Sequence, residues 1–136
     1  MPDNHSGSRR GVPRGMHYQI VHPQRKLVRV VCGRVFDVAV DLRRSSATFG
    51  RWVGTELSEA NRRQVFAPSG FAHGFVVLSD WADVRYKTTD YYGPQHERCL
   101  IWNAPEVGIA WPLAGEPVLA AKDRAGLRLG EVETFA

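Results

Sequence analysis

The chain has 136 residues, an apolar fraction of 43% and a formal net charge of +4, from 18 basic and 14 acidic residues. That length suggests one domain, and the apolar fraction is enough to bury a core. No apolar run approaches the ~18 residues of a membrane-spanning helix. The first ten residues lack the apolar stretch of a signal peptide. We therefore expect a protein with no membrane partner, located in the cytoplasm.

The positive charge is spread along the chain, although Arg9, Arg10 and Arg14 cluster near its start. A solvated cationic face and a site for a phosphate both fit this cluster. No nucleic-acid motif accompanies it, so we expect no nucleic-acid partner. Cys32 and Cys99 form no C-x-x-C pair. We interpret both as reduced thiols of a cytoplasmic protein.

Short segments of alternating or β-branched character dominate the chain. The first two are "KLVRVV" at 26–31 and "RVFDVAVDL" at 34–42. In the second, apolar residues share one face, while Asp37 and Asp41 fall on the opposite face. Residues 32–34 between the two segments predict a tight hairpin, whose central glycine supplies the unusual backbone angles.

Further strand-like segments follow at 51–57, 63–67, 74–79 and 82–89. Helical signals are scarce: 58–63 opens on a serine cap but is only one or two turns long, and 117–126 could form one short helix. Many short strands separated by turns predict an all-β jelly-roll barrel or sandwich, with a cavity for a small ligand. We expect one domain over 1–136, with 1–10 as an N-terminal segment that could be mobile and 130–136 as a C-terminal tail.

Two motifs resemble the metal-binding motifs of the cupin superfamily. The second motif, Pro-x-Gly-x-x-His, is intact and ends on His73. The first keeps His17, but it has Gln19 where a second histidine is usual and Lys26 where a glutamate is usual. An ammonium group has no lone pair to give and repels a cation. The sequence therefore predicts no metal here, and instead a pocket for an anion or a developing oxyanion.

Each of these polar residues also fits a structural role, because a single histidine on a strand is more often structural than catalytic. Their number favours function, since a barrel interior with so many polar groups would be costly without a polar ligand. The residues assigned to inward faces are Arg14, His17, Gln19, Lys26, His73 and Tyr86.

Longer stretches narrow the resemblance to one family. "DNHSGSRRGVPRGMHYQ", "KLVRVV", "PSGFAHGFVVLSD", "YKTTDYY", "WNAPEVGIAWPL" and "AAKDRAG" occur in an order and spacing that resemble the dTDP-4-dehydrorhamnose 3,5-epimerase family, over nearly the whole chain. The resemblance implies a cupin-type jelly roll, a dTDP-linked 4-keto-6-deoxy sugar as substrate, no cofactor and a homodimer. Family members typically carry a further segment before this point, so the resemblance also implies a chain shortened at its N-terminus.

The resemblance further implies roles in proton transfer at C3 and C5, beside the C4 ketone of the sugar. His17 matches the base and Tyr86 the acid, while Lys26 would stabilise the enolate oxygen at C4. Asp123 is expected to hydrogen-bond His17 and fix its tautomer. Pro13 departs from the family pattern, which has a leucine there. The positions that match the substrate site are Asn4, Arg14, Gln19, His73, Tyr92 and Glu97.

Three alternatives remain open on the sequence. A mono-epimerase acting at C3 or C5 alone, in an antibiotic deoxysugar pathway, would share equivalents of His17, Tyr86 and Asp123. A non-catalytic sugar-nucleotide-binding cupin would keep the pocket but exchange no substrate hydrogens. A metal-dependent cupin is the third alternative, and Lys26 argues against it.

Overall fold

The structure is a computed structural model that describes residues 3–21, 23–89, 94–113, 117, 119 and 121–136. Nine strands and two short helical segments occur in this part of the chain. The strands are β1 (Asp3–Arg9), β2 (Pro13–Gln19), β3 (Lys26–Cys32), β4 (Arg34–Asp41), β5 (Trp52–Ser58), β6 (Gln64–Ala67), β7 (Phe71–Val77), β8 (Trp81–Thr88) and β9 (Glu97–Cys99). The helical segments are the 3-10 turn η1 (Pro94–His96) and the helix α1 (Ala121–Arg124).

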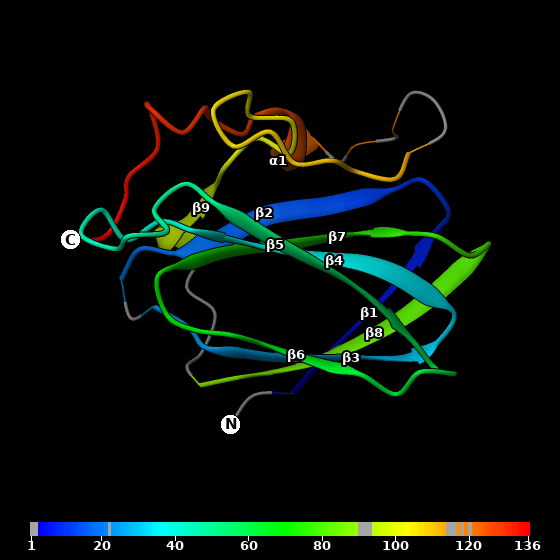
Figure 1. The fold of residues 1–136 in the computed structure, drawn as a ribbon. Coiled ribbons are helices and arrows are strands. Elements are labelled where there is room, and N and C mark those ends of the chain that lie inside the picture. The colour runs from blue at the N-terminus through cyan, green and yellow to red at the C-terminus, as the bar shows by residue number, and fades with distance from the viewer. Residues whose placement is uncertain (1–2, 22, 90–93, 114–116, 118, 120) are drawn as a thin grey trace.

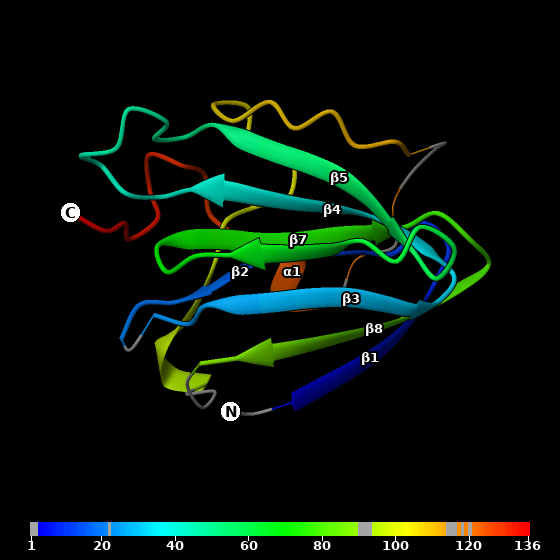
Figure 2. The same cartoon turned by 60° about the horizontal axis from the view of Figure 1, so that its bottom comes forward.

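The strands form two antiparallel sheets that lie face to face (Figure 1 and Figure 2). A four-stranded sheet has the order β1-β8-β3-β6, and a five-stranded sheet has the order β5-β4-β7-β2-β9. Each sheet joins strands that are far apart in sequence, and β1 pairs with β8 along its whole length. This pairing, in which strands distant in sequence join each of two packed sheets, confirms the predicted all-β jelly roll. Residues 3–9 of the expected N-terminal segment are therefore part of the barrel.

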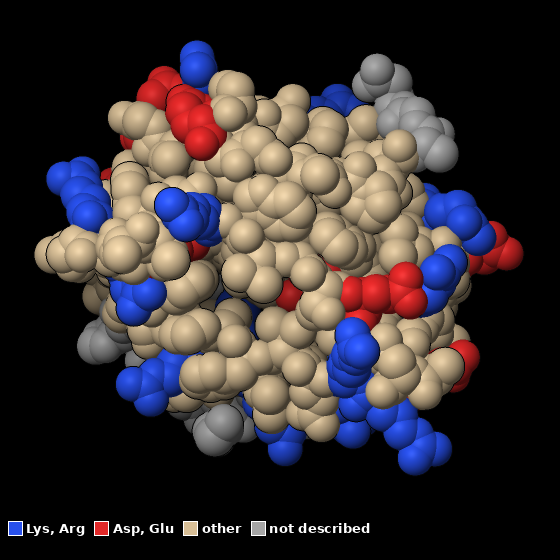
Figure 3. Space-filling view, viewed as in Figure 1, with Lys and Arg blue, Asp and Glu red and all other residues tan. Residues whose placement is uncertain are grey.

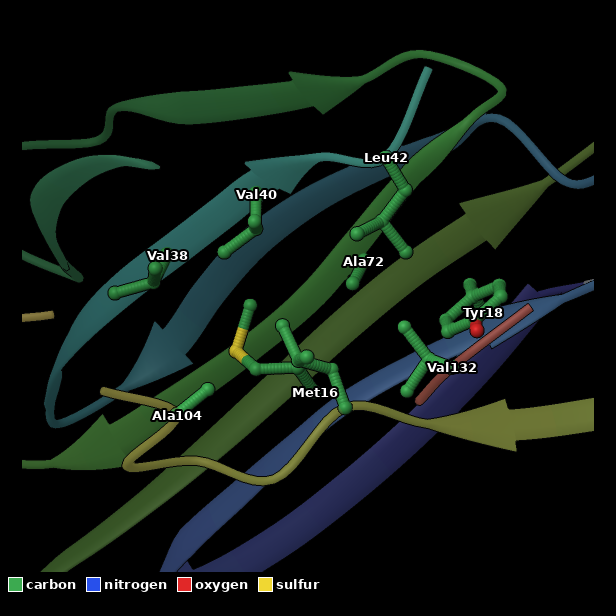
Figure 4. Packing of buried hydrophobic residues seen from close by; sticks show 9 residues of the cluster. Met16, Tyr18, Val38, Val40, Leu42, Ala72, Ala104 and Val132 are labelled. Atoms are coloured by element: carbon green, nitrogen blue, oxygen red, sulfur yellow. The ribbon is translucent and has the colours of Figure 1, made fainter. Parts of the chain in front are cut away.

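Two separate apolar clusters lie on the two faces of the five-stranded sheet. The inner cluster fills the space between the sheets, with Val28 and Val84 from one sheet and Val35 and Phe75 from the other. The outer cluster lies under the C-terminal third of the chain, which runs along the five-stranded sheet (Figure 1). Its labelled members in Figure 4 are Met16, Tyr18, Val38, Val40, Leu42, Ala72, Ala104 and Val132. Each fully buried large apolar side chain stabilises the fold by about 1.5–3 kcal/mol.

The strand β4 alternates as predicted, but both of its faces are covered. Asp37 and Asp41, on the face opposite to the apolar residues, are almost fully buried. Asp41 accepts hydrogen bonds from Nε of Arg43 at 3.0 Å and from Oγ1 of Thr48 at 2.6 Å. Burial alone would raise the pKa of Asp41, but these hydrogen bonds together hold it well below its usual range.

Two local predictions are wrong. Residues 32–34 form no hairpin, because β3 belongs to the four-stranded sheet and β4 to the five-stranded sheet. Gly33, at φ +84°, instead turns the chain from one sheet to the other, and a Cβ there would lie 2.2 Å from a backbone oxygen of β8. Residues 58–63 form the end of β5 and a turn rather than a helix. Ser58 and Asn61 exchange side-chain-to-backbone hydrogen bonds there, which compete with helix formation.

The surface bears on the predicted partners. No helix in the described part of the chain is long and apolar enough to cross a membrane. On the face shown in Figure 3, Lys and Arg side chains lie mainly around the margin, and the centre is mostly tan with a few Asp or Glu atoms. That face therefore offers no continuous basic surface of the kind that binds nucleic acid.

Candidate active site

The strand β2 brings two of the predicted site residues into the barrel. It begins at Pro13, a position where a strand tolerates the missing N–H of proline. The register between β2 and β7 then shifts between Arg14 and His17, which marks a bulge. Bulges re-aim side chains. Past this one, Met16 packs into the outer cluster, while His17 and Gln19 lie on the alternate positions that face the interior.

His17 lies between two carboxylates. Its Nε2 is 2.7 Å from Oδ1 of Asp123, and its Nδ1 is 3.2 Å from Oε1 of Glu97. Asp123 is 1% exposed, whereas His17 and Glu97 retain 18% and 17% exposure. Both contacts are close enough for hydrogen bonds but not well aligned, and among the described residues Oδ1 of Asp123 and Nδ1 of His17 have no hydrogen-bond partner. The imidazole therefore has a carboxylate on each side and keeps part of its surface exposed.

Asp123 reaches His17 because the turn that follows α1 packs tightly against the end of β9. The chain after α1 bonds to β9 and the residues that follow it: N–H of Leu127 donates to the carbonyl of Cys99, and N–H of Ile101 donates to the carbonyl of Leu127. Gly126 makes this approach possible. A Cβ at Gly126 would lie 2.8 Å from Cα of Ile101 and 3.1 Å from Sγ of Cys99.

The four-stranded sheet supplies Lys26 and Tyr86 from the facing side of the barrel. They come from the neighbouring strands β3 and β8, and the ammonium of Lys26 lies 5.8 Å from the centre of the Tyr86 ring. Burial raises the pKa of Tyr86, the negative charge of Glu97 raises it further, and the positive charge of Arg14 opposes them. Tyr86 is therefore a neutral phenol at pH 7, the form that can donate a proton.

A second histidine–carboxylate pair lies beside the first. His73 is the register partner of His17 across β2 and β7, and its Nε2 is hydrogen-bonded to Oδ2 of Asp37 at 2.7 Å. A pocket of ≈ 270 Å³, counted to its open mouth, has Gln19, Lys26 and His73 among its lining residues. Asp37 is a site residue that sequence reasoning missed. Its signal is the alternation of β4, which places an aspartate on the face that points between the sheets.

The remaining predicted residues lie at different distances from this centre. Arg14 is held by β1, because its Nε donates to Oγ of Ser8 at 3.0 Å. Asn4 pairs with Tyr86 in the register of β1 and β8, while its side chain lies outside the described part of the structure. Tyr92 also lies outside the described residues.

The class of protein follows from fold and site together: a jelly-roll barrel of the cupin type whose interior carries histidine–carboxylate pairs on one sheet and a tyrosine and a lysine on the other. A comparison with protein families gives the particular family. The profile of the dTDP-4-dehydrorhamnose 3,5-epimerase family matches residues 1–131. The chain belongs to this family.

Individual relatives are similar to this chain in sequence and in structure. The dTDP-4-dehydrorhamnose 3,5-epimerase of Pseudomonas aeruginosa is 59% identical over 133 residues, covering 98% of this chain and 74% of its own. The dTDP-4-dehydrorhamnose 3-epimerase of Streptomyces niveus is 44% identical, covering 94% of this chain and 62% of its own. The crystal structure of the dTDP-6-deoxy-D-glucose-3,5-epimerase of Legionella pneumophila, in complex with dTDP-4-keto-L-rhamnose, matches with a TM-score of 0.95 at 50% identity, covering 98% of this chain and 71% of that one.

Proposed function

We propose that this chain is a dTDP-4-dehydrorhamnose 3,5-epimerase, which inverts C3 and C5 of dTDP-4-keto-6-deoxy-D-glucose in the formation of dTDP-L-rhamnose. The observation that carries the proposal is His17, held by Asp123 at 2.7 Å on one sheet of the barrel, with Tyr86 on the facing sheet. Inversion at carbon needs a base on one face and an acid on the other. The names and the 59% identity of its relatives support the same reaction.

His17 is the base. The negative charge of Asp123, 2.7 Å from Nε2, holds the imidazole in place, and the imidazole takes the hydrogen from C3 or C5. These hydrogens are acidic because the C4 ketone delocalises the carbanion as an enolate. Asp123 stabilises the imidazolium that forms, as a triad carboxylate does.

Tyr86 and Lys26 complete the reaction from the facing sheet. The Tyr86 phenol returns a proton to the opposite face of the carbon, and its raised pKa keeps that proton available at neutral pH. The ammonium of Lys26 faces the C4 oxygen and stabilises its negative charge in the enolate. The position at which a metal cupin would place a carboxylate ligand thus holds the positive charge that this chemistry requires.

Six further residues are proposed to hold the substrate. Arg14 suits a diphosphate oxygen, because a guanidinium binds phosphate through two donors. His73, fixed by Asp37, and Gln19 lie on the pocket and suit the hydroxyl groups of the sugar. The others, on the strength of the family motif, are Asn4, Tyr92 and Glu97.

We further infer a homodimer of single-domain chains in the cytoplasm. The outer face of the four-stranded sheet supports the dimer, because Leu27 and Phe66 are register partners there and are 39% and 59% exposed. Neighbouring apolar side chains left in solvent are typical of a protein interface. Cys32 and Cys99, both described, form no disulfide, which supports a reducing compartment.

Incubation with dTDP-4-keto-6-deoxy-D-glucose in deuterated water tests the function, with deuterium located by NMR. We expect deuterium at both C3 and C5. The substitution His17→Ala should slow both exchanges by roughly 10³-fold, as loss of a general base does. His5→Ala is a matched control, because His5 also contacts an aspartate, Asp83 at 3.2 Å, but on the surface.

Each other outcome selects a different function. Deuterium at one carbon alone would assign the chain as a mono-epimerase. Retained dTDP binding without any exchange would leave a non-catalytic sugar-nucleotide-binding protein. Equal exchange by the His17→Ala and His5→Ala variants would remove His17 from the role of base.

A further inference from the structure

A thiol lies beside the pair of His17 and Asp123, and the epimerase reaction does not use it. Cys99 is the register partner of His17 across β9 and β2, and its Sγ lies near the backbone oxygens of Gly15 and Leu100, at 3.7 and 3.5 Å. One ligand atom each of His17, Cys99 and Asp123 all lie within 4.8 Å of one another. Nitrogen, thiolate sulfur and carboxylate oxygen are the ligands that zinc prefers.

The spacing of the three ligand atoms is close to that of a tetrahedral zinc site. Zinc bonds of about 2.0–2.3 Å place neighbouring ligand atoms about 3.3–3.6 Å apart. Here Nε2 of His17 and Oδ1 of Asp123 are 2.7 Å apart, and Sγ of Cys99 lies within 4.8 Å of a ring nitrogen of His17 and of a carboxylate oxygen of Asp123. An ion between them therefore requires side-chain shifts of only about 1 Å, and water from the cavity supplies a fourth ligand.

Two further observations point to a ligand at this place. Oδ1 of Asp123 is buried and accepts no well-directed hydrogen bond from the described residues, a costly state for a carboxylate. A histidine that binds metal usually donates its other ring N–H to a carboxylate. Oε1 of Glu97 lies 3.2 Å from Nδ1 of His17, within the distance but not the alignment of such a hydrogen bond.

We propose that His17, Cys99 and Asp123 form an inhibitory site for a thiophilic divalent cation such as Zn²⁺. The cation binds Nε2 of His17, the carboxylate of Asp123 and the thiolate of Cys99, whose proton is released to water. The remaining ring proton of His17 then lies on Nδ1, facing Glu97, and Nε2 is bound to the metal, so neither ring nitrogen has a lone pair left to accept a proton. The site shares His17 with the metal position of the cupin superfamily, but its other ligands differ, because Gln19 and Lys26 stand in place of ligands there.

Cobalt titration of the full chain tests the site without reference to any activity. Co²⁺ bound to a thiolate gives a charge-transfer band in the near ultraviolet. We expect one equivalent of Co²⁺ to produce this band in the natural protein and in the control variant Cys32→Ala, which removes the exposed thiol. Cys99→Ser and Cys99→Ala should lose it, and circular dichroism identifies a variant that fails to fold. A band that persists in a folded Cys99 variant overturns the proposal, as does its loss in Cys32→Ala.

Zinc inhibition then tests the consequence, which rests on the proposed function. Deuterium exchange by the natural protein and by Cys32→Ala should fall as Zn²⁺ binds. The folded Cys99 variant should retain its basal exchange and need a roughly tenfold or higher Zn²⁺ concentration for the same inhibition, since loss of a supporting ligand weakens metal sites to this extent or more. Equal inhibition of the Cys99 variant contradicts the proposal. Absence of all exchange, with the cobalt band intact, rejects the epimerase function and leaves the metal site.

Discussion

Glu97 acts on both the proposed base and the proposed acid of the site. It lies 3.2 Å from Nδ1 of His17, and its charge is one of the causes that raise the pKa of Tyr86. The same carboxylate therefore holds the proposed base in place and keeps the proposed acid protonated. Because Tyr86 has a raised native pKa, its phenolate forms more readily in the unfolded chain, and this contribution to stability is lost as the pH rises above about 10.

Replacement of Glu97 by glutamine should lower the pKa of Tyr86 towards its ordinary value, because it removes a negative charge that disfavours the phenolate. Titration of the phenolate absorbance measures the shift. A parallel titration of a Tyr86→Phe variant shows which part of the signal belongs to Tyr86. An unchanged or higher pKa in Glu97→Gln would show that the charge of Glu97 does not raise the pKa of this phenol.

At the scale of elements, the site depends on how closely the turn after α1 lies against the end of β9. His17 is positioned by the strands of one sheet. Asp123, in contrast, lies on a four-residue helix near the end of the chain. Gly126 sets that distance, since a Cβ there would contact the backbone of Ile101 at 2.8 Å. A small change in this packing therefore moves Asp123 relative to His17, the proposed base.

Gly126→Ala should destabilise the fold by about 1–3 kcal/mol, as overpacking of a tight contact does. It should also slow deuterium exchange, because α1 must move and carry Asp123 away from His17. Urea unfolding and the exchange assay measure the two effects. Gly130→Ala is the matched control, because a Cβ there meets nothing within 4 Å. Similar behaviour of the two variants would contradict this account of α1.

The sequence predicts the positions of strands well, but it does not predict which sheet each strand joins. The segments 26–31, 34–42 and 82–89 are strands because alternation is a local pattern. A glycine with φ > 0 fits both a hairpin and a connection between two sheets. Gly33 therefore does not reveal that β3 and β4 belong to different sheets. Asp37 was missed as a site residue for a related reason. The alternation along β4 shows on which face Asp37 lies. That this face is buried follows only from the second sheet, which packs over it.

On the whole molecule, the outer side of the four-stranded sheet carries two exposed apolar side chains among charged ones such as Arg29 and Arg85. The C-terminal segments cover the outer side of the five-stranded sheet (Figure 1), whereas the outer side of the four-stranded sheet exposes Leu27 and Phe66. The proposed dimer buries these two side chains against a second copy. Isologous pairing of one face with itself is the commonest symmetry of such assemblies.

Phe66→Lys should weaken the dimer by roughly tenfold or more, because a charge would enter the centre of an apolar contact. Sedimentation velocity over a range of concentrations measures the dissociation constant. Val53→Lys is the control: Val53 is 70% exposed but lies on β5, in the other sheet. A monomeric natural protein, or equal effects of the two substitutions, would reject this face as the interface.

The late position of Asp123 has a consequence for the order of events during synthesis. All nine strands precede residue 100, and the carboxylate that orients His17 follows more than twenty residues after the last of them. A chain emerging from the ribosome thus has every barrel strand available before it has the partner of its base. The C-terminal segment that carries Asp123 also covers the outer cluster. His17 therefore gains its carboxylate partner only when that cluster is buried.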